Sequence, residues 1–360
     1  MYLESLKLKN FRSYDELDIK FYKGINFLTG LNGEGKTNIL ESISLLALGK
    51  SFVTSSEKEC IRTSKEFARI EAVINKQNRE KFEIVLSDIG KKISLNGKEI
   101  RKISEMSGKV YIVTFDPNDV YFYKGSSLER RKFIDISLSM LSPAYLSCIS
   151  LFRKLLKNRN LLLKENEVNE KLIEVINEQI APVEYEIVKM RTKFINEMNK
   201  SILKIYNKLS IPAEDSKLVY KTEIPYFDEK EKFIKEVIMN FKRDYEVDIK
   251  RKSTSRGIHH DDVNFFFRGN NIASTGSQGQ NRIASLILKL SLADLIKEKY
   301  KEEPILLLDD VLSELDIKHQ EKLGILLNEY TQAFITGTEI PNVIKNVNEY
   351  EVSNHSMRRK

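Results

Sequence analysis

One octapeptide near the N-terminus has the composition of a phosphate-binding loop. Residues 30–37 read Gly-Leu-Asn-Gly-Glu-Gly-Lys-Thr and fit the pattern G-x-x-x-x-G-K-[ST]. In such loops the glycines let backbone N–H groups surround phosphates, the lysine reaches the β- and γ-phosphates, and the final hydroxyl ligates Mg²⁺. An apolar run at 25–28 precedes the loop and a helical pattern begins at 38, so a helix N-terminus would also face the anion. We therefore predict a nucleotide site whose binding residues are Gly30, Asn32, Gly33, Gly35, Lys36, Thr37 and Asn38.

A second candidate site lies at the end of an apolar run close to the C-terminus. Residues 305–310 read Ile-Leu-Leu-Leu-Asp-Asp, which predicts a buried strand followed by two carboxylates. In phosphate-loop enzymes the acidic residue at such a strand end holds Mg²⁺ beside the hydroxyl of the loop. We therefore predict Thr37 and Asp309 as the Mg²⁺ ligands. Asp310 would orient or deprotonate an attacking water, so the predicted catalytic residues are Lys36, Asp309 and Asp310.

The segment 276–280, Gly-Ser-Gln-Gly-Gln, stands immediately before another predicted helix. Ser277 and Gly279 would suit an anion at the helix N-terminus. Because the first loop already holds one nucleotide, this anion would belong to the nucleotide of a second molecule, and both residues would act in trans. The simpler interpretation is an N-cap, in which Ser277 or Gln278 only opens the helix. Arg12 also has two interpretations, a contact with the nucleotide or a solvated charge at a strand end.

The composition is typical of a globular protein with a moderate positive charge. The chain has 360 residues, of which 41% are hydrophobic and 31% charged, and its formal net charge is +7. This charge permits nucleic acid as a partner, but the base composition of the genome explains it equally well. No run approaches the ~20 apolar residues of a membrane span, the N-terminus lacks a signal-peptide layout, and the two cysteines make no metal-type spacing. We expect a cytoplasmic protein with no membrane partner.

The pattern of elements indicates an α/β protein interrupted by a long helical region. Strands are expected first, at 6–8, 17–21, 68–74, 81–86, 92–95 and 110–115, with a hairpin turn at Asn96-Gly97. Glycine is absent from about 127 to 209, and from Ile187 to Leu209 apolar residues recur every three or four positions. This stretch predicts an antiparallel helical arm with helices of about 50–60 Å, in which Pro182 is a kink or a helix start.

The α/β pattern returns in the last part of the chain. Strands are expected at 262–268, 305–309 and 333–336, a helix at 280–297 and a solvated tail at 356–360. The predicted domains are residues 1–125 and 254–360, which together form one head, and residues 126–253, which form the arm. The sequence therefore predicts a head assembled from both ends of the chain.

Basic residues gather at the start of the predicted arm. The candidates for contact with DNA phosphates are Arg130, Arg131, Arg153, Lys154 and Lys157, and Arg159 and Lys164 extend the same group. The competing interpretation is a solvated charged face. His259 and His260 beside Asp261 and Asp262 resemble a metal site in composition.

The chain resembles the RecF family over essentially its whole length. The order of loop, Ser-Gln-Gly-Gln segment, Asp-Asp strand and residues 313–316 is that of ABC-type ATPase heads, and the helical insertion is that of SMC-type heads. The segments that match RecF lie at 8–14, 30–40, 115–120, 125–135, 256–262, 277–282 and 307–316. The resemblance implies an α/β fold, an ABC-type, SMC-like ATPase head of mixed sheets with an inserted helical arm.

The same resemblance implies a function in DNA replication, recombination and repair. ATP and Mg²⁺ would be the cofactors, and ATP would join two heads into a homodimer that clamps single- and double-stranded DNA at gaps. Slow, DNA-dependent hydrolysis would release the DNA. The implied partners are RecO and RecR, and the implied outcome is the loading of RecA.

Three positions depart from related patterns, and three alternative functions remain. His260 replaces an arginine usual in the family, Asp310 replaces the glutamate of transporter heads, and Thr336 stands near their switch histidine. One alternative is an SMC-type chromosome-organising ATPase, although such arms are far longer. A transporter ATPase subunit is a second alternative, and the wide separation of Thr37 from Ser277 argues against it. The third is a DNA-binding switch whose hydrolysis is incidental.

Overall fold

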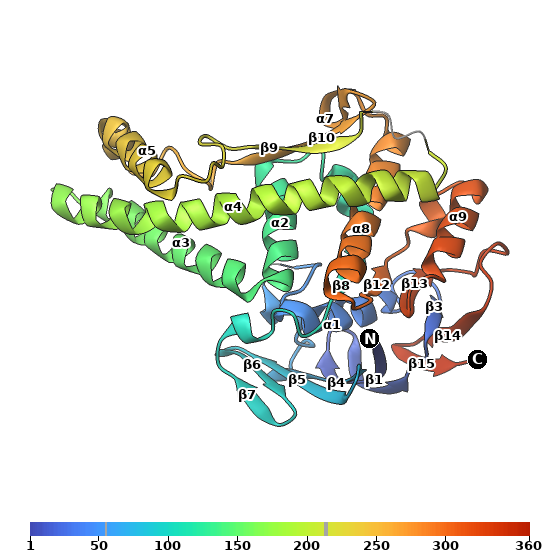
Figure 1. The fold of residues 1–360 in the computed structure, drawn as a ribbon. Helices are drawn as coiled ribbons and strands as arrows, with labels where there is room; N and C mark the ends of the chain where they lie inside the picture. The colour runs from blue at the N-terminus through green and yellow to red at the C-terminus, as the bar shows by residue number, and fades with distance from the viewer. Residues whose placement is uncertain (55, 212–214) are drawn as a thin grey trace. The chain divides into compact units, whose positions relative to one another are not determined.

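The computed structural model describes residues 1–54, 56–211 and 215–360, and the chain divides into two units. The first unit consists of Met1–Asp119, Lys204–Pro212 and Ser285–Lys360, so it is built from both ends of the chain. The second consists of Val120–Leu203 and Ala213–Ala284. Blue and red segments accordingly lie together in the first unit, whereas green and yellow segments make up the second (Figure 1).

An antiparallel sheet of six strands forms one layer of the first unit. Its order is β2-β1-β4-β5-β6-β7. The strands are β1 (Tyr2–Phe11), β2 (Tyr14–Lys20), β4 (Phe67–Asn75), β5 (Arg79–Ser87), β6 (Gly90–Leu95) and β7 (Lys98–Ile100). Side chains of β4 and β5 alternate between buried and less buried positions, which leaves one face packed and the other charged. The predicted hairpin is confirmed, since Asn96 and Gly97 join β6 to β7 with φ of 52° and 80°.

The second sheet of this unit is mostly parallel. Its order is β15-β14-β3-β13-β12-β8, and the five strands from β14 to β8 run parallel. The strands are β3 (Gly24–Thr29), β8 (Ile112–Phe115), β12 (Ile305–Leu308), β13 (Gln332–Gly337), β14 (Val347–Ser353) and β15 (Ser356–Arg359). The four residues of β12 are fully buried, as a continuous apolar run in a covered parallel sheet requires.

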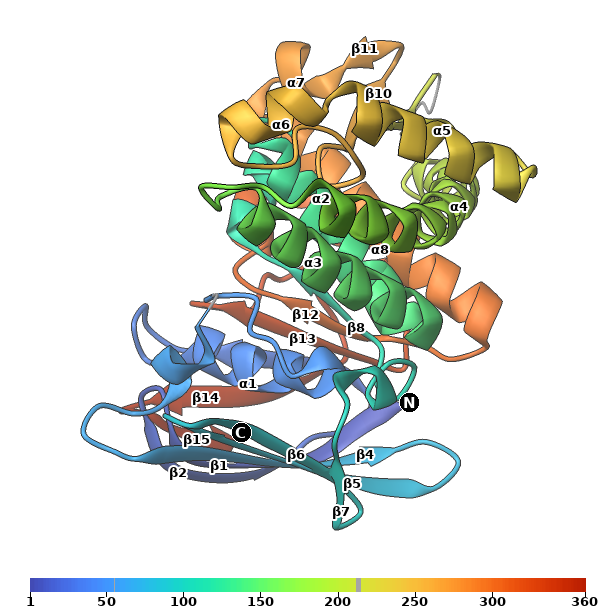
Figure 2. The same cartoon turned by 90° about the vertical axis from the view of Figure 1, so that its left-hand side faces the viewer.

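Helix α1 (Lys36–Leu48) occupies the space between the two sheets. In both views it lies between β8, β12 and β13 on one side and β1 and β4 on the other (Figures 1 and 2). Eleven of its thirteen residues are buried, so the helix is held by packing along most of its circumference. It begins where the phosphate-binding loop ends, and the packing therefore fixes the position of the loop.

The second unit consists of helices and a small sheet. Its elements are α2 (Ser127–Leu141), α3 (Pro143–Leu162), α4 (Glu170–Lys208), β9 (Lys217–Lys221), α5 (Lys230–Arg243), α6 (Tyr245–Arg251), β10 (Asp262–Phe267), β11 (Asn270–Asn271) and α7 (Ile272–Thr275). Helix α8 (Gln278–Tyr300) begins in this unit and ends in the first, as α4 does. The predicted apolar stripe is confirmed, since Ile187, Phe194, Met198 and Ile202 are buried. With 39 residues, α4 is about 58 Å long.

One prediction about local structure is wrong, and one alternative is excluded. Pro182 lies inside α4, so it does not begin a helix, and the kink stays a prediction. Residues 356–360 are not a solvated tail, because β15 pairs with β14: Met357 lies opposite Val352, and Ser356 lies opposite Ser353. Among the residues that the structure describes, no helix is both long enough and apolar enough to cross a membrane.

Candidate nucleotide-binding site

The sheet order brings the phosphate-binding loop and the Asp-Asp segment to one edge. The loop follows the end of β3, the two aspartates follow the end of β12, and β13 lies between these strands. Because the three strands are parallel, their C-terminal ends meet on the same side of the sheet. The prediction that segments from opposite ends of the chain meet is therefore confirmed for these residues of the first unit.

Close backbone packing explains two glycines of the loop. A Cβ on Gly30 would lie 2.3 Å from the Val352 carbonyl oxygen, which no side chain tolerates. Gly35 has φ of 100°, and a Cβ there would lie 2.8 Å from the Ser13 hydroxyl. The loop is therefore held against β14 on one side and the β1–β2 turn on the other.

Lys36 is directed back onto the loop that precedes it. Its Nζ donates to the carbonyl oxygens of Gly30 at 2.6 Å and Leu31 at 2.9 Å. Burial lowers the pKa of Lys36, while the negative charges of Asp310, Asp309 and, less strongly, Glu34 oppose that shift. A cation that bonds only to carbonyl oxygens retains its full charge for an anion, because those acceptors do not neutralise it.

Thr37, Asp309 and Thr336 form a chain of hydroxyl and carboxylate oxygens across the ends of three elements. The Thr37 Oγ1 lies 3.0 and 2.9 Å from the two Asp309 carboxylate oxygens. Thr336, on the central strand β13, donates from its hydroxyl to Asp309 Oδ1 at 2.7 Å. Burial raises the pKa of Asp309, and the hydrogen bonds from Thr336 and Thr37 act in the opposite direction.

This oxygen cluster fits a small hard cation. Mg²⁺ takes oxygen ligands in an octahedron at 2.0–2.1 Å, which places adjacent ligands about 3 Å apart. The two distances between Thr37 and Asp309 match that spacing. Asp309 Oδ1 accepts from both Thr336 and Thr37, whereas Oδ2 contacts Thr37, the other predicted cation ligand.

Asp310 has an unusual backbone conformation at the end of β12. Its φ is 49°, in the left-handed region, and its side chain is exposed. Its backbone N–H donates to the Thr336 hydroxyl at 2.9 Å. Thr336 thus contacts both aspartates, and the sequence had marked it only by its position near a switch histidine. This function depends on β13 lying beside β12, so the local sequence around Thr336 carries no signal for it.

The remaining predicted nucleotide residues of this unit lie around the loop. Asn32 and Gly33 are exposed, and the Asn38 side chain donates to the Ser13 hydroxyl at 3.0 Å. Arg12 is not a solvated charge, since its guanidinium donates twice to the fully buried Glu41 carboxylate, both at 2.7 Å. Neither contact tests whether Arg12 or Asn38 touches a nucleotide, so both assignments stay predictions.

Ser277 begins α8 in the second unit, where its side chain caps the helix. The Ser277 hydroxyl accepts from the Gln280 N–H at 3.2 Å, and the Gln280 side chain accepts from the Ser277 N–H at 2.9 Å. This reciprocal pair is a capping box. Ser277 and Gly279 are both exposed, and a Cβ on Gly279 would meet nothing within 4 Å. The capping function is therefore present, and action in trans stays a prediction.

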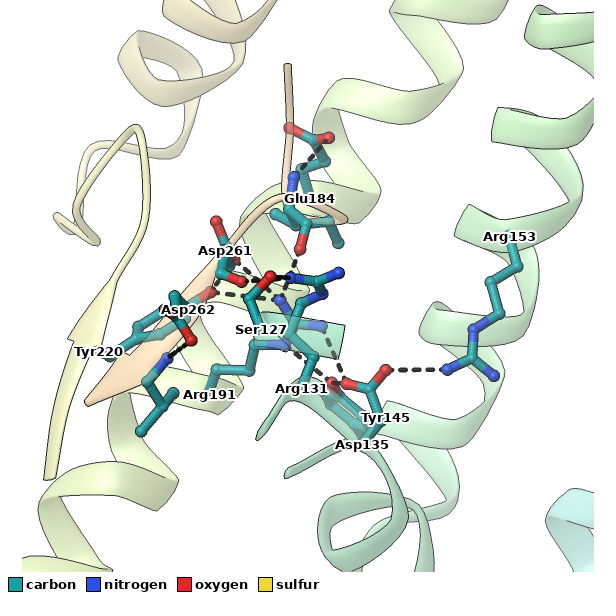
Figure 3. Close-up of polar contacts among 12 residues, drawn as sticks. Ser127, Arg131, Asp135, Tyr145, Arg153, Glu184, Arg191, Tyr220, Asp261 and Asp262 are labelled. Atoms are coloured by element: carbon teal, nitrogen blue, oxygen red, sulfur yellow. Dashed lines mark hydrogen bonds and ion pairs between the residues drawn. The ribbon is translucent and has the colours of Figure 1, made fainter. Parts of the chain in front are cut away.

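The basic residues predicted to bind DNA fall into two groups. Arg130 donates to both Asp262 oxygens at 2.7 and 3.0 Å. Arg131 donates to the Ser127 hydroxyl and to the Asp261 carbonyl (Figure 3). These two arginines hold α2 against the start of β10. The other group, on α3, is exposed and consists of Arg153, Lys154 and Lys157.

Arg159 differs from its neighbours on α3. It is fully buried and bonds to Asp248, Thr254 and Asn177, each at 2.7 Å. The prediction that it extends a basic surface is therefore wrong, because its guanidinium is enclosed between α4 and α6. Its position in sequence, four and seven residues after the apolar Leu155 and Phe152, was the available signal.

A buried polar network surrounds Arg191 in the same unit (Figure 3). Arg191 donates to Asp135 at 2.9 Å and to Asp261 at 2.8 Å, and Asp135 also accepts from Arg153 at 2.8 Å. Nearby, burial and the charge of Asp261 raise the pKa of the fully buried Glu184 to about 8. The network joins α2, α3, α4 and the segment before β10, and it gives the 256–262 motif a structural function.

The two histidines of that motif share one acceptor. His259 and His260 both approach the Thr254 carbonyl oxygen with Nε2, at 3.2 and 3.4 Å. Burial and the neighbouring His260 lower the pKa of His259 to about 4. Across the residues that the structure describes, no group of three or more His, Cys, Asp and Glu side chains could hold a metal ion.

Comparison with known proteins assigns the family. The model of the RecF/RecN/SMC N-terminal domain matches residues 2–358. The chain is 36% identical to the DNA replication and repair protein RecF of Halalkalibacterium halodurans over the full length of both chains. It is also 36% identical to the RecF of Bacillus subtilis, with 95% of each chain covered.

Solved structures agree with this assignment. The structure of the recombination mediator protein RecF-ATP in the RecFOR pathway matches with a TM-score of 0.93 and 29% identity, and the match covers 100% of this chain and 97% of that one. An SMC head bound to the C-terminal winged-helix domain of ScpA matches with a TM-score of 0.55 at 18% identity, which shows the fold alone. The fold is therefore the predicted SMC-like ATPase head with an inserted helical arm, and the chain belongs to the RecF family.

Proposed function

We propose that this protein is an ATP-dependent DNA-binding protein of recombinational repair, in which ATP joins two heads into a clamp. The observation that carries the proposal is the pairing of Thr37 with Asp309, at 2.9 and 3.0 Å, beside the phosphate-binding loop. These residues come from opposite ends of the chain, and their meeting has no simpler explanation than a shared Mg²⁺–nucleotide site.

The residues of the first unit divide the work of binding ATP. The backbone N–H groups of residues 30–35 and the start of α1 would surround the phosphates, and the Lys36 ammonium would balance the charge of the β- and γ-phosphates. Thr37 and Asp309 would hold Mg²⁺, which when bound neutralises charge on the phosphates. Thr336 would keep Asp309 in place by its hydrogen bond.

Asp310 is the proposed base that orients or deprotonates the attacking water. Its side chain is exposed at the end of β12, and its charge is close enough to Lys36 to act on that pKa. The hydrogen bond from its backbone N–H to Thr336 holds the Asp310 backbone in place, and this limits the positions that its carboxylate can take. We propose that hydrolysis is slow and needs a second molecule, because an aspartate is one methylene shorter than the glutamate of transporter heads.

The second molecule would contribute Ser277 and Gly279 of α8. Both are exposed, and the positive end of the helix dipole at the start of α8 suits a γ-phosphate. ATP would then lie between two chains, and dimerisation would depend on nucleotide. This arrangement makes hydrolysis a signal for release of the partner.

DNA is the proposed substrate of the dimer. The exposed Arg153, Lys154 and Lys157 on α3 would contact its phosphates, and the net charge of +7 supports association with a polyanion. The relatives are DNA replication and repair proteins, and the RecF-ATP structure is that of a recombination mediator in the RecFOR pathway. We therefore propose gapped DNA as the target, RecO and RecR as partners, and RecA loading as the outcome.

Nucleotide binding and turnover by matched variants test this function. We expect the wild-type chain to bind ATP with Mg²⁺ and to hydrolyse it faster when gapped DNA is added. Lys36→Ala should weaken ATP binding roughly 10–100-fold, since it removes a charge-assisted hydrogen bond. Asp310→Asn should retain binding and lose turnover. Unchanged turnover by Asp310→Asn would refute the assignment of the base, and a wild-type chain that binds no ATP would refute the function.

A further inference from the structure

The C-terminal hairpin lies directly against the phosphate-binding loop. Strand β14 runs parallel to β3, with Tyr350 beside Leu28 and Glu351 beside Thr29. At the next position the Val352 carbonyl is so close to Gly30 that a Cβ there would lie 2.3 Å from it. The backbone of β14 therefore restricts the course of the loop where it leaves the sheet at Gly30.

The turn of the hairpin makes a second contact with the loop. Asn354 and His355 join β14 to β15 with φ of 51° and 54°, as a two-residue turn of type I′ requires. The Asn354 backbone N–H donates to the side-chain carboxylate of Glu34, the fifth residue of the octapeptide. This bond joins the outer part of the loop to residues more than 300 positions away.

The hairpin is itself anchored in the core, so it can support what it touches. Tyr350 and Val352 are buried, and the Tyr350 hydroxyl donates to the Lys20 carbonyl at 2.9 Å. On β15 the Arg359 guanidinium lies 4.0 Å from the centre of the Tyr22 ring. By contrast Leu31 is 73% exposed, and a Cβ on Gly33 would meet nothing within 4 Å. Residues 31–33 of the loop therefore have little packing around them, and Glu34 provides a contact that anchors this part of the loop to the hairpin.

The chemistry of Glu34 makes this contact relevant to phosphate binding. A free carboxylate in the loop would repel a polyphosphate, and it could also bond to the loop N–H groups that the phosphates need. A carboxylate that accepts from the Asn354 N–H keeps its charge, but the oxygen bonded to the hairpin is not available to those loop N–H groups. We propose that the C-terminal hairpin, residues 347–359, is a positioning element of the nucleotide site, which acts through the bond between Asn354 and Glu34. This inference deepens the proposed function and rests on it.

Two matched pairs of variants in the full chain test the proposal. Glu34→Gln keeps an acceptor for Asn354 without the charge, whereas Glu34→Ala removes both the charge and the acceptor. Asn354→Gly suits the positive φ of the turn, whereas Asn354→Val places a β-branched residue there and displaces it. Because the turn is exposed, neither substitution disturbs the core.

ATP affinity is the first readout. We expect Glu34→Ala to bind ATP about 5-fold more weakly than Glu34→Gln, as the loss of one hydrogen bond predicts. Asn354→Val should weaken binding relative to Asn354→Gly by a similar factor, and this difference should vanish in the Glu34→Ala background. Equal affinities of Glu34→Ala and Glu34→Gln would overturn the proposal, and so would an undiminished effect of Asn354→Val when Glu34 is absent.

Hydrogen exchange of the Asn354 amide without nucleotide is the second readout. Exchange should be slow in the wild type and in Glu34→Gln, and at least several-fold faster in Glu34→Ala. Equal exchange in all three chains would overturn the proposal. A wild-type chain that shows the expected exchange but binds no ATP would refute the proposed function instead, so the two failures are distinguishable.

Discussion

Replacing Thr336 tests whether its hydroxyl, and not its shape, organises the carboxylates. Thr336 is buried at the end of β13 and makes two hydrogen bonds, as donor to Asp309 at 2.7 Å and as acceptor from the Asp310 N–H at 2.9 Å. Thr336→Val keeps the volume and removes both bonds. Thr336→Ser keeps the hydroxyl and removes one methyl group.

The stability of Thr336→Val relative to Thr336→Ser distinguishes a hydrogen-bonding function of Thr336 from a space-filling one. Loss of a bond to a charged carboxylate and of a bond to a backbone N–H should lower the free energy of unfolding of Thr336→Val by about 2–3 kcal/mol. Loss of one buried methyl should cost Thr336→Ser only about 1 kcal/mol. If Thr336 served only to fill space, valine would be the better replacement and serine the worse one.

Urea unfolding at pH 8 measures which of the two variants is more stable. The pH dependence of Mg²⁺-dependent ATP binding measures how the loss of the Thr336 hydroxyl affects Asp309. Burial raises the pKa of Asp309 and the bond from Thr336 lowers it, so the Thr336→Val change should raise that pKa further. Because a metal ligand must be deprotonated, the pH below which ATP binding is lost should move upward in Thr336→Val and stay unchanged in Thr336→Ser. Equal or greater stability of Thr336→Val, with an unshifted pH profile, would refute the reasoning.

Three further predictions concern the arm. Because the pKa of Glu184 is raised to about 8 from its ordinary 4.5, the folded chain keeps a proton that the unfolded chain releases, and stability falls as pH rises between these values. Glu184→Gln should therefore remove a pH dependence on the order of a few kcal/mol, as measured by urea unfolding at pH 5 and pH 9. Arg159→Ala should lower the free energy of unfolding by about 3–5 kcal/mol, because it leaves the buried Asp248 unpaired. The control Lys157→Ala, on the exposed face, should change it by less than about 0.5 kcal/mol. Equal effects of the two substitutions would contradict the structure. The double change of Lys154 and Lys157 to Gln should reduce the slope of log affinity for DNA against log salt by about 2, and an unchanged slope would place the DNA contacts elsewhere.

The residues of the nucleotide site could be predicted from the sequence, but the hydrogen bonds that hold them in place could not. The loop at 30–37 and Asp309 are local patterns whose flanking runs reveal strand ends, so their meeting could be predicted. The bonds from Thr336 to the aspartates and from Arg12 to Glu41 depend on which strands become neighbours. Nothing in the local sequence determines that order.

The arm and the C-terminus show how charge misleads a prediction made from sequence. Arg159 looked like one more basic residue on α3, yet it belongs to the apolar face and is enclosed by polar partners. The segment 356–360 was predicted to be a solvated tail, and three of its five residues are basic. Its apolar Met357 alternates with the charges, and the Asn354-His355 pair supplies a turn, so pairing with β14 was the physically consistent alternative.

The most direct test of the clamp is the mass of the particle in solution, measured by light scattering. For wild type and Asp310→Asn with ATP and Mg²⁺ we expect twice the chain mass of 41.8 kDa, and the Asp310→Asn dimer should persist because it cannot hydrolyse ATP. Lys36→Ala should show no dependence on ATP. A mass that is the same with and without ATP in all three chains, with and without gapped DNA, would contradict the account.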